Sequence, residues 1–210
     1  MARTPLTKKR LFGLDRSGPP PPQTRRKEPL NPWTIPNAIG FLRLALVPAF
    51  LVMGLNSGDG RDALATVLFA VIAWSDYLDG MAARLTGQYS RLGALLDPLT
   101  DRLLVLSGAI VAWEFELLPR WTLAVLAGRE LFMLVLTQVA LRKGMDLKVN
   151  MLGRWAVWPV MFALAVAFCL VSWVSDALMY LGLAMTLVAT AMYVQDGLRH
   201  LRGQGDAPSS

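Results

Sequence analysis

Residues 76–84 read Asp-Tyr-Leu-Asp-Gly-Met-Ala-Ala-Arg, and Gly93, Asp97 and Asp101 follow closely. The region holds four aspartates within 26 residues, inside or beside segments apolar enough to cross a membrane. An ionised aspartate near a bilayer centre costs roughly 2.5–3.5 kcal/mol on insertion scales. The basic residues close by in the sequence are Arg84, Arg91 and Arg102. Divalent cations would balance the remaining negative charge, so we expect a metal site here.

The composition indicates an integral membrane protein. The 210 residues are 54% hydrophobic, the mean hydropathy is +0.43, and the apolar residues form blocks about long enough to cross a ~30 Å hydrocarbon core. The single cysteine, Cys169, excludes an internal disulfide. Residues 1–30 contain no apolar segment of the kind that a cleavable signal peptide needs.

The chain divides into two tails and one all-α membrane domain. Residues 1–30 are basic and proline-rich, so we expect a disordered tail with an affinity for anionic lipid. Residues 31–202 form the expected polytopic catalytic domain, and residues 203–210 a flexible tail. The predicted six transmembrane helices cover residues 35–55, 63–83, 93–113, 121–141, 155–174 and 177–195.

The basic residues predict the orientation of these spans. Sixteen of the 21 lysines and arginines lie in the two tails and in the loops after the second and fourth spans. Arg61 and Arg120 alone lie in the opposite loops. By the positive-inside rule both termini are cytoplasmic, and the aspartates lie toward the cytoplasmic end of their spans. This rule also accounts for the net charge of +6 without a nucleic-acid partner.

The spacing of the aspartates places them on two facing helix surfaces. Asp76 and Asp79 are three residues apart, and Asp97 and Asp101 are four apart, so each pair shares one side of its helix. The link between the two helices is short, which favours antiparallel packing with both pairs at one depth. Small residues beside them, namely Gly80, Ala83 and Gly93, leave room for a bulky ligand.

The chemistry of four carboxylates favours hard cations. Oxygen ligands suit Mg²⁺, Mn²⁺ or Ca²⁺, and four aspartates suit two ions that clamp a phosphate whose bond is broken. A further carboxylate can act as general base toward a hydroxyl nucleophile. The structural alternative is that the aspartates pair with Arg84, Arg91 and Arg102 to hold the helices together.

The pattern Asp-x2-Asp-Gly-x2-Ala-Arg-x8-Gly-x3-Asp-x3-Asp resembles the signature of the CDP-alcohol phosphotransferase family. The chain matches every fixed position, namely Asp76, Asp79, Gly80, Ala83, Arg84, Gly93, Asp97 and Asp101. The resemblance implies the fold of that family with six transmembrane helices, a homodimer and two divalent cations, Mg²⁺ or Mn²⁺. It also implies transfer of a substituted phosphate from a CDP-linked donor to an alcohol, with release of CMP.

The resemblance also implies roles for individual residues. Asp76, Asp79, Asp97 and Asp101 resemble the metal ligands, and Asp101 resembles the base that deprotonates the acceptor hydroxyl. The surface that receives the cytidine and diphosphate would comprise Asp79, Gly80, Ala83, Arg84 and Gly93.

Looser similarities concern the donor and the acceptor. Ile35-Pro36-Asn37 followed by Arg43, and residues 96–102, are similar to bacterial phosphatidylglycerophosphate synthases and CDP-diacylglycerol-dependent cardiolipin synthases. We therefore expect an enzyme of the bacterial cell membrane that uses CDP-diacylglycerol, with its active site at the cytoplasmic face. Glycerol 3-phosphate is the first expected acceptor, and phosphatidylglycerol and inositol phosphate are alternatives.

An anionic acceptor needs cations of its own. The candidates are Arg129, Arg154 and Lys148, although Arg154 stands where the family has lysine. The alternative role of Arg129 is an internal ion pair with Glu130. The alternative role of Lys148 is that of a topology signal only, and Arg43 has an alternative role as a packing residue. A different class of function, cation transport through the aspartate cluster, fits less well because the polar groups lie at one end of the membrane.

Overall fold

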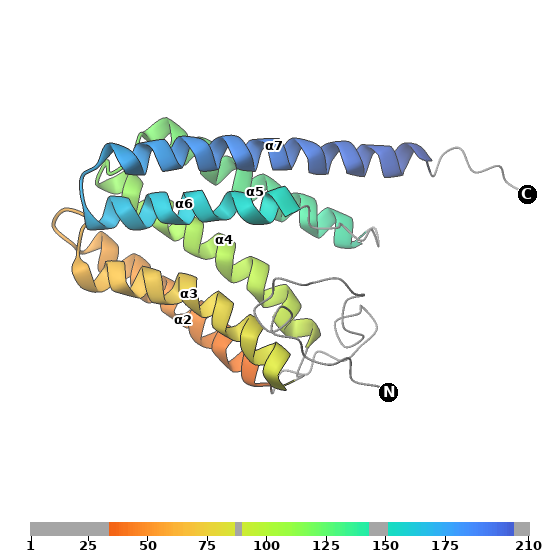
Figure 1. Ribbon diagram of the computed structural model, residues 1–210, viewed down its shortest axis with the longest axis horizontal. Helices are drawn as coiled ribbons and strands as arrows, with labels where there is room; N and C mark the ends of the chain where they lie inside the picture. The colour runs from red at the N-terminus through yellow and green to blue at the C-terminus, as the bar shows by residue number, and fades with distance from the viewer. Residues whose placement is uncertain (1–33, 87–89, 143–150, 204–210) are drawn as a thin grey trace, which may run out of the picture. The chain divides into compact units, whose positions relative to one another are not determined.

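A computed structural model describes residues 34–86, 90–142 and 151–203, and all regular structure in these ranges is α-helical. The helices, in chain order, are α2 (Ile35–Leu55), α3 (Ala63–Thr86), α4 (Arg91–Glu114), α5 (Arg120–Arg142), α6 (Met151–Cys169) and α7 (Trp173–Gly203) (Figure 1). The all-α prediction is therefore confirmed. The expected N-terminal tail, residues 1–30, lies outside the described residues, as does the expected C-terminal tail of residues 203–210 except Gly203, which ends α7.

Three of the described helices are long and apolar enough to cross a membrane. They contain the segments Ile35–Leu55, Ala63–Ala83 and Trp173–Gln195, while Ala156–Cys169 is a shorter apolar helix. Helices α4 and α5 are less apolar because charged residues such as Asp101 and Arg129 interrupt them. The apolar helices support an integral membrane protein, and the count of six spans stays a prediction.

Side-chain caps fix where α3 and α4 begin. The backbone N–H of Ala65 donates to Asp62 Oδ2 at 2.7 Å, before the first turn of α3. At the start of α4, the Gly93 N–H donates to Ser90 Oγ at 2.9 Å. Such caps satisfy N–H groups that have no partner within the helix. Pro98 lies inside α4, and the helix nevertheless continues to Glu114.

The chain forms two compact units. The first contains the chain up to Met53 together with Val67–Ser107, so it includes most of α2 and α3 and the first part of α4. Its interior contains Phe50 and Phe69, whose ring centroids are 5.2 Å apart, and Ile72, which is fully buried. All four signature aspartates belong to this unit.

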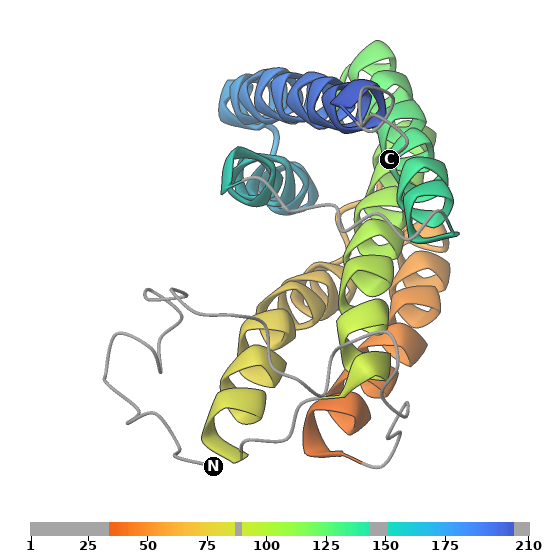
Figure 2. The same cartoon turned by 90° about the vertical axis from the view of Figure 1, so that its right-hand side faces the viewer.

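The second unit contains Gly54–Thr66 and Gly108 onward. Within it α6 and α7 run antiparallel and side by side, seen along their length in Figure 1 and nearly end-on in Figure 2. They approach closely at Gly182, where an added Cβ would lie 2.6 Å from Val160 Cγ2 and 2.8 Å from the Val160 backbone nitrogen. Glycine at this position is what permits the close contact of the two helices.

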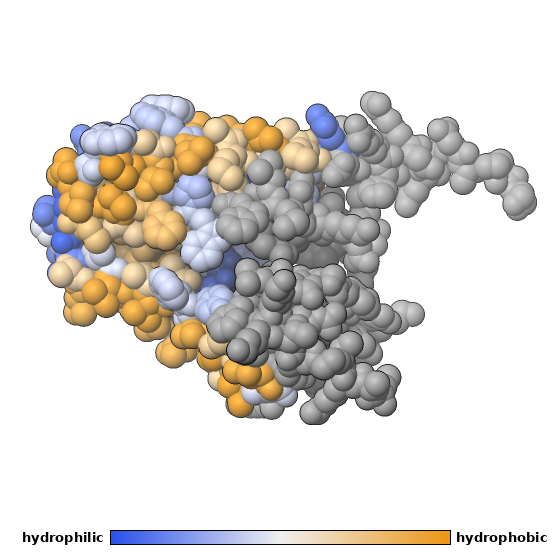
Figure 3. Space-filling model, in the orientation of Figure 1, coloured by the Kyte–Doolittle hydropathy of each residue, from blue (hydrophilic) through white to orange (hydrophobic). Residues whose placement is uncertain are grey.

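The outer surfaces of the helices are strongly apolar. Along α3 the exposed hydrophobic side chains recur every three or four residues, at Val67, Val71, Trp74 and Leu78. Figure 3 shows hydrophobic residues over much of the visible surface of α6 and α7 as well. An exposed apolar stripe with this spacing, on a helix long enough to span a bilayer, is suited to contact with lipid.

Candidate active site

A buried arginine joins two of the signature aspartates. Arg43 of α2 donates from Nη1 to Asp76 Oδ1 of α3 at 3.1 Å and from Nη2 to Asp101 Oδ1 of α4 at 2.8 Å. Its Nε also donates to the backbone carbonyl of Ile72 at 3.4 Å. One guanidinium therefore connects three helices.

Arg43 lies on the buried side of α2, which explains why it reaches this position. Residues 43, 47 and 50 follow one another on one face of the helix, and Arg43, Val47 and Phe50 are all at most 4% exposed. The sequence does not reveal this face, since α2 is apolar on all sides. Sequence reasoning named Arg43 as a packing residue and missed it as the partner of the aspartates.

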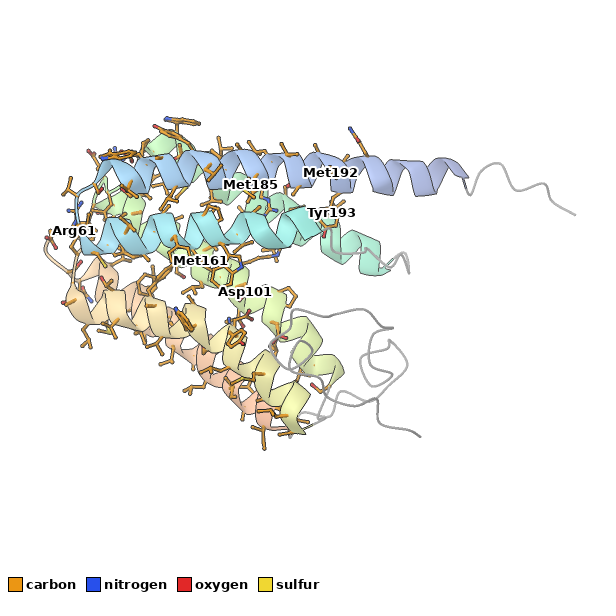
Figure 4. All side chains as sticks on the ribbon, in the orientation of Figure 1. Arg61, Asp101, Met161, Met185, Met192 and Tyr193 are labelled. Atoms are coloured by element: carbon orange, nitrogen blue, oxygen red, sulfur yellow. The ribbon has the colours of Figure 1, made fainter. Side chains whose placement is uncertain are left out.

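The two carboxylates are much more open than the arginine that holds them. The side chains of Asp76 and Asp101 are 47% and 38% exposed, against 1% for Arg43. Figure 4 labels the Asp101 side chain on α4. The guanidinium thus contacts the carboxylates from the protein interior and leaves their other side accessible.

The remaining signature residues are only partly described. Asp97 lies on α4 one turn before Asp101 and is partly exposed, and Ala83 lies on α3 and is also partly exposed. Asp79, Gly80 and Arg84 belong to α3, but their side chains fall outside the described part of the structure. The described side chains do not include that of Asp79. Among them, no group of three histidines, cysteines or acids is arranged to hold a metal.

The donor set nevertheless fits a divalent cation. Asp76, Asp97 and Asp101 offer carboxylate oxygens, which are the ligands that Mg²⁺ and Mn²⁺ prefer. The guanidinium contacts Oδ1 of Asp76 and Oδ1 of Asp101. Thr100 lies between Asp97 and Asp101 in the sequence. Its hydroxyl is fully buried and has no hydrogen-bond partner in the described part of the chain.

A second set of contacts fixes the start of α4 beside this site. Ser90 Oγ donates to Asn37 Oδ1 of α2 at 2.6 Å, and Asn37 is 1% exposed. A Cβ at Gly93 would lie 2.8 Å from Asn37 Oδ1. Gly93 therefore has a packing role, in addition to the nucleotide-binding role that the sequence predicts for it.

Of the three cations expected to bind the acceptor, the structure describes the side chain of one, Arg129. Arg129 of α5 is 9% exposed, forms an ion pair with Glu130, and donates from Nε to Thr190 Oγ1 of α7 at 3.0 Å. This is the internal ion pair that the sequence left as an alternative. Lys148 and the side chain of Arg154 lie outside the described residues, so an acceptor role for any of these cations stays a prediction.

Comparisons with known proteins agree on one family. The sequence model described as CDP-alcohol phosphatidyltransferase matches residues 33–188. A CMP-forming cardiolipin synthase of Streptomyces coelicolor is 42% identical over 135 residues, which cover 62% of this chain and 62% of that protein.

Two similar relatives carry another name, CDP-diacylglycerol–glycerol-3-phosphate 3-phosphatidyltransferase. The one from Bacillus subtilis is 31% identical over 63% of this chain and 75% of its own length. The one from Cereibacter sphaeroides is 33% identical over 65% of this chain and 63% of its own length.

Proposed function

Because this chain belongs to the CDP-alcohol phosphatidyltransferase family, we propose that it transfers a phosphatidyl group from CDP-diacylglycerol to the hydroxyl of an alcohol and releases CMP. The product then enters phospholipid biosynthesis. The carrying observation is the family match over residues 33–188, which includes all eight signature positions. The meeting of Asp76 and Asp101 at Arg43 supports the proposal, since it brings acids from two helices to one site.

The chain's own residues account for the parts of this reaction. Asp76, Asp79, Asp97 and Asp101 would hold two divalent cations, Mg²⁺ or Mn²⁺, which supply positive charge to the phosphates of the donor and to departing CMP. Asp101 accepts the proton of the acceptor hydroxyl. The hydroxyl oxygen forms a bond to the β-phosphorus of the donor, the phosphatidyl phosphorus, and the bond from that phosphorus to CMP breaks.

The donor site is proposed from the signature residues that surround the acids. Gly80, Ala83 and Gly93 would let the nucleotide approach the helix backbone, and Arg84 would contact its phosphates. Asp79 would contribute to both the metal and the nucleotide site. An active site at the cytoplasmic face, with both termini cytoplasmic, lets a water-soluble acceptor and the headgroup of a lipid donor arrive together. A homodimer is part of the same proposal.

Glycerol 3-phosphate is the first candidate acceptor, and the product is then phosphatidylglycerophosphate. The names of the Bacillus and Cereibacter relatives support this choice. Arg154 and Lys148 are the cations proposed to bind the acceptor phosphate, together with Arg129 if it leaves its pairing with Glu130.

Phosphatidylglycerol is the second candidate, and it would give cardiolipin. Two observations favour it: the 42% identity to the Streptomyces cardiolipin synthase, and the pairing of Arg129 with Glu130, which engages one of the proposed phosphate-binding cations.

One assay tests the reaction and separates the acceptors. The full chain, purified into lipid nanodiscs, is incubated with CDP-diacylglycerol, Mg²⁺ or Mn²⁺, and each acceptor in turn, and CMP and lipid products are measured. We expect CMP release with one acceptor and its loss after treatment with EDTA. No CMP release with any acceptor would contradict the proposal, and cation flux without CMP release would support a transporter instead.

A further inference from the structure

We propose that Arg43 is a positioning residue for the metal ligands: its guanidinium orients Asp76 and Asp101 so that they bind divalent cations. This inference rests on the proposed function, because that function supplies the metal site. It adds a residue outside the eight signature positions and assigns it a task on a different helix, α2.

Arg43 contacts both aspartates with directed hydrogen bonds. Arg43 forms hydrogen bonds with Asp76 at 3.1 Å, Asp101 at 2.8 Å and the Ile72 carbonyl at 3.4 Å. Both aspartates accept through Oδ1. Since a carboxylate is planar, fixing one oxygen by a directed hydrogen bond restricts where the other oxygen points.

Arg43 is much more buried than the two aspartates that it contacts. Arg43 is 1% exposed, whereas the side chains of Asp76 and Asp101 are 47% and 38% exposed. A buried charge requires partners, and the packed interior holds this guanidinium in one place. Partly exposed carboxylates, in contrast, would have rotameric freedom without such an anchor. The rigid arginine therefore sets the geometry, and the aspartates follow it.

The shape of the arginine side chain suits a positioning role better than lysine does. A planar guanidinium presents several N–H donors in a fixed arrangement and can serve two carboxylates and a carbonyl at once. A lysine ammonium carries the same charge on a single nitrogen at the end of a flexible chain. Groups that hydrogen-bond metal ligands in this way typically change metal affinity or activity by 10–100-fold when they are replaced.

Charge alone predicts the opposite result, and this makes the inference testable. If Arg43 only offset the charge of empty carboxylates, its removal would leave the site more negative and would tighten cation binding. If it orients the carboxylates, its removal weakens cation binding. The sign of the change in affinity separates the two roles.

The experiment measures Mn²⁺ binding to the full chain in zwitterionic nanodiscs, with free Mn²⁺ followed by electron paramagnetic resonance. We expect Arg43→Gln to weaken Mn²⁺ binding by about 10–100-fold, and Arg43→Lys to lie between this variant and the unaltered protein. The matched control is Arg120→Gln, which removes an arginine that pairs with Glu116 in the second unit, and it should leave Mn²⁺ affinity unchanged. If Arg43→Gln does not fold, Arg43→Lys supplies the comparison.

The outcomes are distinguishable from those of the proposed function. Mn²⁺ affinity that is equal or higher in a folded Arg43 variant would overturn the positioning role, whatever the CMP assay shows. If the unaltered protein binds Mn²⁺ but releases no CMP, the proposed reaction fails, and the positioning role is still decided by the change in affinity. If the unaltered protein binds no Mn²⁺, the positioning role is overturned, and the CMP assay alone decides the proposed reaction.

Discussion

One substitution can separate the contact that Asp101 makes from the catalytic role proposed for it. Asp101 accepts a hydrogen bond from Arg43, and in the proposed reaction it also accepts the acceptor's proton. Asp101→Asn keeps an oxygen that can accept from Arg43 but removes the basic carboxylate. We expect CMP release to fall by about 100-fold or more, since positioned general bases contribute ~10²–10⁴-fold.

The matched control for this prediction is Asp176→Asn. Asp176 is a partly exposed acid in the first turn of α7, in the other unit. It should retain full CMP release. Both variants are to be compared by CMP release and by thermal unfolding in detergent, and near-normal activity of Asp101→Asn would remove its role as base.

The acids of this site were predictable from the sequence, and their arginine was not. Spacing of three or four residues places acids on one side of a helix, so local rules pair Asp76 with Asp79 and Asp97 with Asp101. Arg43 is 33 residues from Asp76 and 58 from Asp101 in the chain. No rule of helical spacing spans such separations, and only tertiary packing brings these residues together.

At the scale of helices, Gly93 controls how α4 begins against α2. Gly93→Ala would place a Cβ 2.8 Å from Asn37 Oδ1 and 3.1 Å from Ser90 Oγ. We expect a loss of about 1–3 kcal/mol in the free energy of unfolding, the usual cost of overpacking, seen as a lower midpoint of thermal unfolding. Gly128→Ala is the control, because its Cβ would meet nothing within 4 Å, and stability should be unchanged or slightly raised.

Gly182 has the corresponding role between α6 and α7. The added Cβ of Gly182→Ala would lie 2.8 Å from the Val160 backbone nitrogen, and backbone moves less readily than a side chain. The two helices must therefore separate, and we again expect a loss of about 1–3 kcal/mol. Ala184→Met enlarges an exposed side chain of the same helix and should change the unfolding midpoint little. Equal midpoints for the two variants would contradict a close contact at Gly182.

The helices themselves were largely predictable, and their ends less so. The first span was expected at residues 35–55, as α2 is. The fifth was expected to continue to residue 174, but α6 ends at Cys169. Leu170, Val171 and Val174 surround the turn with apolar residues, so composition hides it, whereas the Ser172 hydroxyl accepts from the Val174 N–H and marks the start of α7.

At the scale of the whole molecule, the distribution of basic residues makes a testable prediction about orientation. In a background without Cys169, single cysteines are placed at two exposed positions, Asp59 between α2 and α3 and Thr86 at the end of α3. We expect a membrane-impermeant maleimide to label Asp59→Cys in intact cells and Thr86→Cys only after the cells are opened. The reverse pattern would show that the predicted orientation is wrong.

The family assignment and the structure inform different parts of the molecule. The family match covers residues 33–188 and supports the chemistry of the acids. The structure adds contacts that no signature contains, such as Asn37 with Ser90. Lys148 and Arg154, which are proposed to bind the acceptor, lie within the matched residues, but their side chains are outside the part of the chain that the structure describes.

The link through Arg43 also has an evolutionary consequence. A descendant that lost catalysis would be free to replace Asp76 and Asp101, but its buried guanidinium would then lose two carboxylate partners, which is destabilising. Selection for folding alone would therefore remove Arg43 soon after the acids. Across inactive descendants we expect these three positions to be replaced together. A neutral residue at position 43 would then mark a chain that has lost its catalytic activity.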